Sequence, residues 1–155
     1  MIFYFEPIYD EESEILILGS FPSVISRKNN FYYGNPNNRF WKVLARIWNE
    51  EVPRTIDEKK EFLLRNHIAL ADIAIACDIV GSKDESMTNI KARDIRPILE
   101  QTNIKKVFCN GRKAEEILKT TGYKKAKYLP STSPANGAYS LEDLIEIWSK
   151  EIRHG

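Results

Sequence analysis

Residues 15–23 read Ile15-Leu16-Ile17-Leu18-Gly19-Ser20-Phe21-Pro22-Ser23, and this stretch indicates the class of fold. The aliphatic residues before Gly19 form an uninterrupted apolar run, which is typical of a parallel strand that is buried on both faces. Gly19 ends the run. The polar residues after it, through Arg27-Lys28-Asn29-Asn30, predict a loop at the carboxyl end of this strand.

Further apolar runs and amphipathic segments alternate along the rest of the chain. Strands are predicted over 68–70, with a continuation toward Val80, and over 106–109 and 127–129. Helices are predicted from Asn37 or Asn38 to Trp48 and over 57–66, 93–101, 113–120 and 140–152. This alternation predicts one α/β domain over residues 1–155, with a short, mainly parallel four-stranded sheet and helices on both faces.

The composition excludes several classes of protein. Two cysteines, Cys77 and Cys109, cannot form a disulfide-dense framework, and two histidines, His67 and His154, cannot supply a three-histidine zinc site. The N-terminal residues lack the basic and apolar regions of a secretory signal, and the most apolar stretch, 68–80, is too short to span a bilayer. We therefore expect a cytoplasmic protein with no metal site and no membrane contact.

The net charge alone does not indicate what the protein binds. Twenty-three Lys and Arg residues against 22 Asp and Glu residues give a formal charge of +1. A local basic patch can nevertheless bind nucleic acid on a neutral chain. The cations expected in or beside the loops that follow the strands are Arg27, Lys28, Arg39, Lys83 and Arg112.

The most unusual residues fall in loops beyond the carboxyl ends of the predicted strands, where open α/β sheets bind ligands. Residues 32–41 combine aromatic rings, which can stack on a flat base, with asparagine amides, which can orient water or read a base edge. The alternative is that the asparagines cap a helix and the aromatic rings pack. Residues 129–137 offer hydroxyl and backbone N–H groups that suit phosphate oxygens, or form a plain surface turn.

The motifs of several common enzymes are missing. The sequence contains no P-loop, no glycine-rich dinucleotide motif after a strand and no nucleophile elbow. Asp72, Asp78 and Asp94 are candidate general bases. We expect each to be a helix cap or a charge at the rim, because no paired arrangement of carboxylates is visible.

Taken together, residues 19–23, 33–41 and 129–136 resemble the uracil-DNA glycosylase superfamily. The set most resembles the hypoxanthine-DNA (deoxyinosine) glycosylase branch, and next the mismatch-specific uracil/thymine branch. The resemblance implies a three-layer α/β/α sandwich that acts as a monomer in base-excision repair, without metal or cofactor. It implies hydrolysis of the N-glycosidic bond of a deaminated base in DNA, with hypoxanthine the first expectation and uracil or xanthine also possible. Such an enzyme flips the nucleotide and stabilises an oxocarbenium-like transition state with positioned donors and water.

The resemblance also implies roles for individual residues. Asn38 is expected to position the attacking water, and Tyr33 to stack on the flipped base. Phe21 stands where the mismatch-specific branch has a catalytic asparagine, and is expected to line the base pocket with Asn110. The residues expected to contact the DNA are Ser20, Pro22, Ser23, Ser82, Lys83, Ser131, Thr132, Ser133 and Asn136.

Two other functions fit the same residues. Phe21 in place of the asparagine suggests a catalytically weak or inactive DNA-binding member of the same fold. A hydrolase of free nucleosides or nucleotides would need a similar pocket for the base.

Overall fold

The computed structural model describes residues 1–154. The helices and strands follow in the order β1 (Ile15–Gly19), α1 (Val24–Asn29), α2 (Phe40–Ile47), α3 (Ile56–Arg65), β2 (Ile68–Asp72), β3 (Ala74–Asp78), the short 3-10 helix η1 (Asp84–Ser86), β4 (Thr88–Ala92), α4 (Arg96–Glu100), β5 (Lys106–Asn110), α5 (Arg112–Lys119), β6 (Lys127–Leu129) and α6 (Leu141–His154).

The main sheet has four strands in the order β2-β1-β5-β6, and every neighbouring pair is parallel. The sheet predicted from the apolar runs is therefore confirmed. Because all four strands run in the same direction, their carboxyl ends meet at one edge. Gly19 at the end of β1 lies opposite Asp72 at the end of β2, and β5 ends beside them at Asn110.

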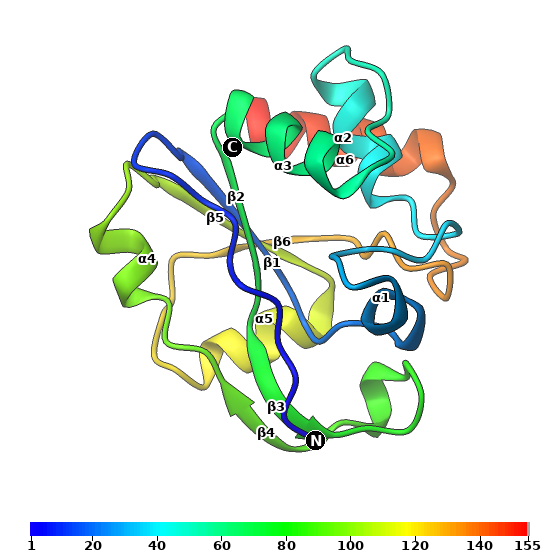
Figure 1. The fold of residues 1–155 in the computed structure, drawn as a ribbon, viewed down its shortest axis with the longest axis vertical. Helices are drawn as coiled ribbons and strands as arrows, with labels where there is room; N and C mark the ends of the chain where they lie inside the picture. The colour runs from blue at the N-terminus through cyan, green and yellow to red at the C-terminus, as the bar shows by residue number, and fades with distance from the viewer. Residues whose placement is uncertain (155) are drawn as a thin grey trace.

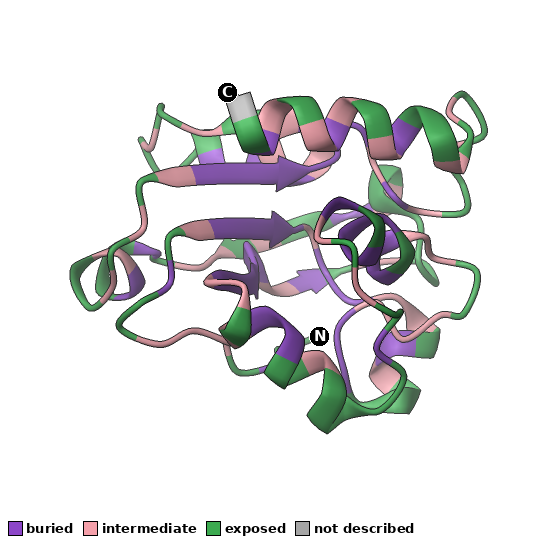
Figure 2. Cartoon of the chain, turned by 90° about the horizontal axis from the view of Figure 1, so that it is seen from above, coloured by how far each residue is buried: buried purple, intermediate pink, exposed green. Residues whose placement is uncertain are grey.

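Helices cover both faces of this sheet, as Figure 1 shows. Alternate residues of β1 point to opposite sides, so Ile17 packs in one core and Leu18 in the other. The first core is filled from α2, α3 and α6, and the second from α4, α5 and β3. The strands lie buried between the two layers (Figure 2). The three-layer α/β/α sandwich is therefore confirmed.

Two predictions made from the sequence were wrong around this sheet. The loop expected after β1 contains α1, because the Ser23 side chain accepts a hydrogen bond from the Ser26 backbone N–H at 3.1 Å and starts a helix. The continuation of β2 toward Val80 is a separate strand, β3, which pairs antiparallel with β4 in a second, two-stranded sheet. We did not predict β4 because its largely exposed, polar residues carry little apolar signal.

Two helices begin later than the sequence indicated. The Asn38 backbone N–H donates to the Asn35 carbonyl at 2.9 Å, so residues 35–38 form a turn and α2 begins at Phe40. Asp94 accepts a hydrogen bond from the Arg96 backbone N–H, which fixes the start of α4. Asp94 is exposed and lies just before the N-cap residue, Ile95, so it is not itself the cap. Within the described residues no helix is long and apolar enough to cross a membrane.

Candidate active site

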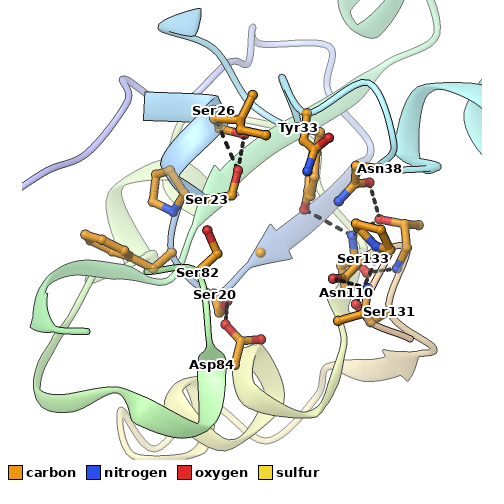
Figure 3. A pocket seen from close by; sticks show the side chains of 18 of the residues that line it. Ser20, Ser23, Ser26, Tyr33, Asn38, Ser82, Asp84, Asn110, Ser131 and Ser133 are labelled. Atoms are coloured by element: carbon orange, nitrogen blue, oxygen red, sulfur yellow. Dashed lines mark hydrogen bonds between the residues drawn. The ribbon is translucent and has the colours of Figure 1, made fainter. Parts of the chain in front are cut away.

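An open pocket of about 600 Å³ lies at the carboxyl edge of the main sheet. Its walls come from the loops after β1, β3 and β6, and its floor from the ends of β1, β2 and β5. Figure 3 shows Asn38, Asn110, Ser131 and Ser133 on one wall, with Ser20, Ser82 and Asp84 on the other. Every residue predicted to contact base or DNA lines this pocket: Ser20, Phe21, Pro22, Ser23, Tyr33, Asn38, Ser82, Lys83, Asn110, Ser131, Thr132, Ser133 and Asn136.

The side chain of Asn38 is held in one orientation. Its Oδ1 accepts hydrogen bonds from the Phe40 backbone N–H at 2.9 Å and from the Thr132 hydroxyl at 2.8 Å. A backbone N–H can only donate, so the atom beside it must be the amide oxygen. Among the hydrogen bonds of residues 1–154, none uses Nδ2 of Asn38. This group can therefore donate to a water or ligand in the pocket, but it cannot accept a proton.

Asn110 supports this arrangement from the end of β5. Its Oδ1 accepts the Thr132 backbone N–H at 3.1 Å, and its Nδ2 donates to the Thr132 hydroxyl and to the Tyr33 phenol, both at 3.1 Å. Both N–H groups of Asn110 are therefore occupied, and only its oxygen has a lone pair free for a base. The hydrogen bonds form a chain from Tyr33 through Asn110 and Thr132 to Asn38.

Tyr33 lines the pocket with a ring that is already stacked on one side. Its ring lies against Phe40, with centroids 3.9 Å apart and planes 17° apart. Burial raises the pKa of the Tyr33 phenol above its ordinary range, so the group stays protonated at neutral pH. The backbone of Tyr33 has a φ of 52°, an uncommon conformation for a tyrosine.

Gly19 keeps the floor of the pocket open. A Cβ added at this position would lie 2.5 Å from Oδ1 of Asp72 and 2.7 Å from the hydroxyl of Tyr33. A side chain at this position would force Asp72 or Tyr33 to move, because heavy atoms do not approach so closely.

Asp72, named from the sequence as a candidate general base, lines the floor of the pocket. The expectation of a cap or a rim charge is wrong here, because the residue is only 5% exposed and lines the pocket floor. Burial raises the pKa of Asp72 to about 7, while the nearby Arg93 guanidinium opposes the rise and Asp84 adds to it. The available signal was a carboxylate directly after four buried residues of β2, at the edge where ligands bind. Asp78, by contrast, is an exposed charge near the N-terminal amine.

Three serine hydroxyls at the mouth keep a hydrogen to donate. Ser82 accepts the Val24 backbone N–H at 2.9 Å, Ser131 accepts that of Ser133 at 3.1 Å, and Ser133 accepts that of Ala135 at 3.2 Å. Each oxygen is thereby fixed in place, while its O–H stays available for a phosphate oxygen. The hydroxyls of Ser20 and Ser23 instead donate within the protein, to Asp84 and Ser26.

The five cations that the sequence placed near the mouth of the pocket do not all lie there. Lys83 lines the pocket. Arg39 donates to the backbone carbonyls of Ser133 and Asn136, both at 2.9 Å, and so stabilises the loop after β6. Arg27 similarly donates to the Gly81 carbonyl at 3.1 Å.

The remaining two cations lie outside the pocket lining. The Arg112 guanidinium lies 3.8 Å from the ring centroid of Tyr128. Lys28 is exposed on α1. Of the five cations expected near the mouth, only Lys83 therefore forms part of the pocket wall.

The fold and the pocket define an α/β protein with an amide- and hydroxyl-lined site at the carboxyl edge of a parallel sheet, the place where such folds bind ligands. The model of the uracil DNA glycosylase superfamily matches residues 6–150. The chain belongs to this superfamily.

Two curated relatives and one solved structure cover nearly the whole chain. The hypoxanthine DNA glycosylase of Methanosarcina acetivorans is 37% identical over 155 residues, which cover 97% of each chain. That of Methanosarcina barkeri is 40% identical over 157 residues, covering 96% of each. The solution NMR structure of a candidate uracil DNA glycosylase from Methanosarcina acetivorans superimposes with a TM-score of 0.83 at 35% identity, covering 99% of this chain and 98% of the other.

Proposed function

We propose that this chain is a monofunctional DNA glycosylase that hydrolyses the N-glycosidic bond of hypoxanthine in DNA, as the first step of base-excision repair. The names of the two Methanosarcina relatives support this substrate. The orientation of Asn38 is the observation that carries the mechanism, because its oxygen is fixed by Phe40 and Thr132 and its Nδ2 is left for the pocket.

In this mechanism the damaged nucleotide leaves the duplex and its base enters the pocket. Nδ2 of Asn38 holds a water as a hydrogen-bond donor, with the water oxygen directed at the anomeric carbon. Since an amide does not accept a proton, the glycosidic bond breaks before the water attacks, and the departing base keeps the bonding electrons. The base then takes up the proton that the water loses on adding to the anomeric carbon, and positioning supplies most of the acceleration. Tyr33, supported from behind by Phe40, stacks on the base, and Phe21 closes the pocket beside it.

The serine hydroxyls at the two walls suit the DNA backbone on either side of the flipped nucleotide. Ser82 lies on one wall and Ser131 and Ser133 on the other (Figure 3), and each keeps an O–H for a phosphate. Lys83 adds a positive charge at the same mouth. Since Lys83 is the one of the five expected cations that lines the pocket, we expect a small DNA footprint and a shallow dependence of binding on salt.

We further propose that the protein works as a cytoplasmic monomer without metal or cofactor. The catalytic roles assigned above require only amides, an aromatic ring and water. Cys77 and Cys109 are both buried and unbonded, which suits a reducing compartment. A second candidate function is DNA binding without catalysis. Phe21 favours it, because this buried ring supplies no amide at the position where the mismatch-specific branch has one.

One panel of substrates tests these functions. The protein is incubated with duplexes that contain a single deoxyinosine, deoxyuridine or deoxyxanthosine, and abasic sites are then cleaved with alkali. We expect strand breaks foremost at deoxyinosine. Binding to these duplexes without breaks would favour the non-catalytic function, and activity confined to free nucleosides would favour the hydrolase of free substrates.

A further inference from the structure

Ser26 is a buried polar side chain that takes no part in the mechanism proposed above. Serines mostly lie at protein surfaces, because a buried hydroxyl loses its hydrogen bonds to water. Within residues 1–154 five polar or charged residues are buried, and four of them line the pocket: Ser26, Asp72, Asn110 and Thr132. Ser26 is 3% exposed and belongs to α1, on the opposite side of Tyr33 from Asn110 (Figure 3).

The hydroxyl of Ser26 holds the loop that carries Tyr33. Oγ of Ser26 accepts the backbone N–H of Gly34 at 2.9 Å. From the same helix, Nδ2 of Asn29 donates to the Gly34 carbonyl at 2.9 Å. The two peptide groups that flank Gly34 are therefore both hydrogen-bonded to α1, directly after Tyr33 in the chain.

Gly34 lies close against this helix. A Cβ at this position would lie 3.1 Å from Cβ of Asn29 and 3.2 Å from the carbonyl oxygen of Phe31. A side chain would therefore press the loop away from α1. The glycine allows the close approach that the two hydrogen bonds require.

Ser26 is itself held at several points. Its backbone N–H donates to Oγ of Ser23, the N-cap of α1, at 3.1 Å, and the Ser23 hydroxyl donates to Oγ of Ser26 at 3.0 Å (Figure 3). Its carbonyl accepts the backbone N–H groups of Asn30 and Phe31. The Ser26 oxygen is therefore a fixed anchor for the Gly34 N–H.

Tyr33 has a backbone that needs such an anchor. Its φ of 52° lies in the left-handed region, which costs free energy for a tyrosine and persists where the surrounding structure imposes it. The ring is held by stacking on Phe40 and by the Asn110 amide, which donates to its hydroxyl. The bonds to Gly34 hold the backbone end of the same residue. Strained conformations of this kind cluster at ligand-binding positions.

We propose that Ser26 is a positioning residue of the base pocket, whose hydroxyl keeps Tyr33 in its left-handed conformation and so presents the ring to the flipped base. Asn29 supports Gly34 from its other side. This assignment rests on the proposed glycosylase function, in which the Tyr33 ring stacks on the base. Without the Ser26 oxygen, the Gly34 N–H loses its partner and the Tyr33 backbone relaxes. The base is then less often held in the reactive geometry.

Ser26→Ala tests the proposal, because it removes the hydroxyl and keeps a residue that suits a helix. Single-turnover release of hypoxanthine from a deoxyinosine duplex, at saturating protein, is measured beside the melting temperature. We expect the rate to fall by about 5- to 30-fold, the range for one buried hydrogen bond.

Ser13→Ala is the matched control. Ser13 is fully buried, its hydroxyl accepts the Asp10 backbone N–H at 3.0 Å, and it lies outside the pocket lining. We expect the two variants to lower the melting temperature to a similar extent, while Ser13→Ala keeps the wild-type rate. A loss of stability alone would not produce this difference.

Two further readouts report on Tyr33 itself. The ring current of Phe40 shifts the NMR signals of the Tyr33 ring, because the two centroids lie 3.9 Å apart. We expect Ser26→Ala, and not Ser13→Ala, to move these signals toward those of an unstacked tyrosine. In a Tyr33→Ala background, Ser26→Ala should cost no further rate, because the ring through which it acts is gone.

A folded Ser26→Ala variant that releases hypoxanthine at the wild-type rate, or whose Tyr33 signals do not move, overturns the proposal. An equal loss of rate with and without the Tyr33 ring also overturns it. If Ser26→Ala does not fold, Asn29→Ala decides, because Asn29 is exposed and makes the other bond to Gly34. We expect it to lose about 2- to 10-fold in rate with shifted Tyr33 signals, and wild-type behaviour overturns the proposal.

Failure of the proposed function is recognised separately. If the wild type releases no base from any of the three duplexes, the proposed function fails, and with it the role of Ser26 in base release. The Tyr33 ring signals still decide whether Ser26 holds the loop. If the wild type is active and only the variants behave unexpectedly, the role of Ser26 alone fails.

Discussion

The hydroxyl of Thr132 donates a 2.8 Å hydrogen bond to the amide oxygen of Asn38, from the loop after β6 to the turn before α2. The same hydroxyl accepts a hydrogen bond from Asn110 at 3.1 Å. Thr132 is fully buried. It therefore joins two loops distant in sequence and determines which end of the Asn38 amide faces the pocket.

Replacing Thr132 by valine keeps the shape and removes both hydrogen bonds. We expect the free energy of unfolding to fall by about 1–3 kcal/mol, because buried groups on Asn38 and Asn110 lose a partner. We expect hypoxanthine release to slow by about 5- to 30-fold, because Asn38 is then held by the Phe40 N–H alone. Urea unfolding and single-turnover kinetics measure the two effects. The control is Thr88→Val on the exposed strand β4, and an equal loss in that variant would argue against a specific role.

Gly19→Ala tests the shape of the pocket floor. The added methyl would lie 2.5 Å from Oδ1 of Asp72 and 2.7 Å from the Tyr33 hydroxyl, so one of them must move. We expect a loss of about 1–3 kcal/mol in unfolding free energy, the usual cost of overpacking, and a loss of base release. Gly137→Ala is the matched control, because a Cβ there meets no atom within 4 Å. A Gly19→Ala variant with unaltered stability and activity would contradict the described floor.

The raised pKa of Asp72 predicts how stability depends on pH. The pKa is about 7 in the folded protein against an ordinary value of 3.8, so between these values the folded state binds more protons than the unfolded state. The stabilisation from protonated Asp72 is complete below about pH 4 and is lost as the pH rises through about 7.

Asp72→Asn should remove this contribution, so its stability should fall less between pH 5 and pH 8 than that of the wild type, by about 1–3 kcal/mol, since one pKa unit corresponds to about 1.4 kcal/mol. Urea unfolding of both proteins at pH 5 and pH 8 measures the difference. Arg93 and Asp84 face the same group and are present in both proteins, so the comparison isolates Asp72. An identical pH dependence in the two proteins would contradict a raised pKa.

Lys83 is predicted to contact a phosphate. Lys83→Ala should weaken binding to all duplexes alike and reduce the slope of log affinity against log salt by about 1. Single-turnover release at saturating protein should change little, because the lysine contacts backbone and not base. Fluorescence anisotropy over a range of salt concentrations measures the slope. Lys124→Ala, an exposed lysine outside the pocket lining, should leave it unchanged; equal slopes for all three proteins would remove Lys83 from the interface.

Local sequence patterns were sufficient to predict the main sheet. The apolar runs that became β1 and β5 are buried on both faces, and such runs have few other interpretations. The strand β4 was not predictable in this way, because it is stabilised by pairing with β3 and by the Arg93 backbone N–H donating to the Ile73 carbonyl at 2.6 Å. These contacts depend on tertiary structure and leave no periodic signal.

The sequence was sufficient to predict which loops form the site. It was not sufficient to predict the contacts that the residues of these loops make. The residues around Tyr33, Asn38 and Thr132 meet because parallel strands end at one edge, which topology alone implies. The burial of Asp72 depends on its register opposite Gly19. In the sequence, one aspartate after a strand gives the same pattern whether it caps a helix, is exposed or is buried. Likewise, only the folded loop after β6 shows that Arg39 is occupied by backbone carbonyls.

The role of Asn38 in positioning the attacking water is tested most directly by single-turnover release of hypoxanthine from a deoxyinosine duplex by Asn38→Ala. We expect a loss of at least about 100-fold, the effect of removing a positioned donor from an active site, with the fold intact by circular dichroism and thermal unfolding. Asn37→Ala changes the exposed neighbouring asparagine, which lies outside the pocket lining, and should keep the wild-type rate. Release at the wild-type rate by a folded Asn38→Ala protein would show that Asn38 does not position the attacking water.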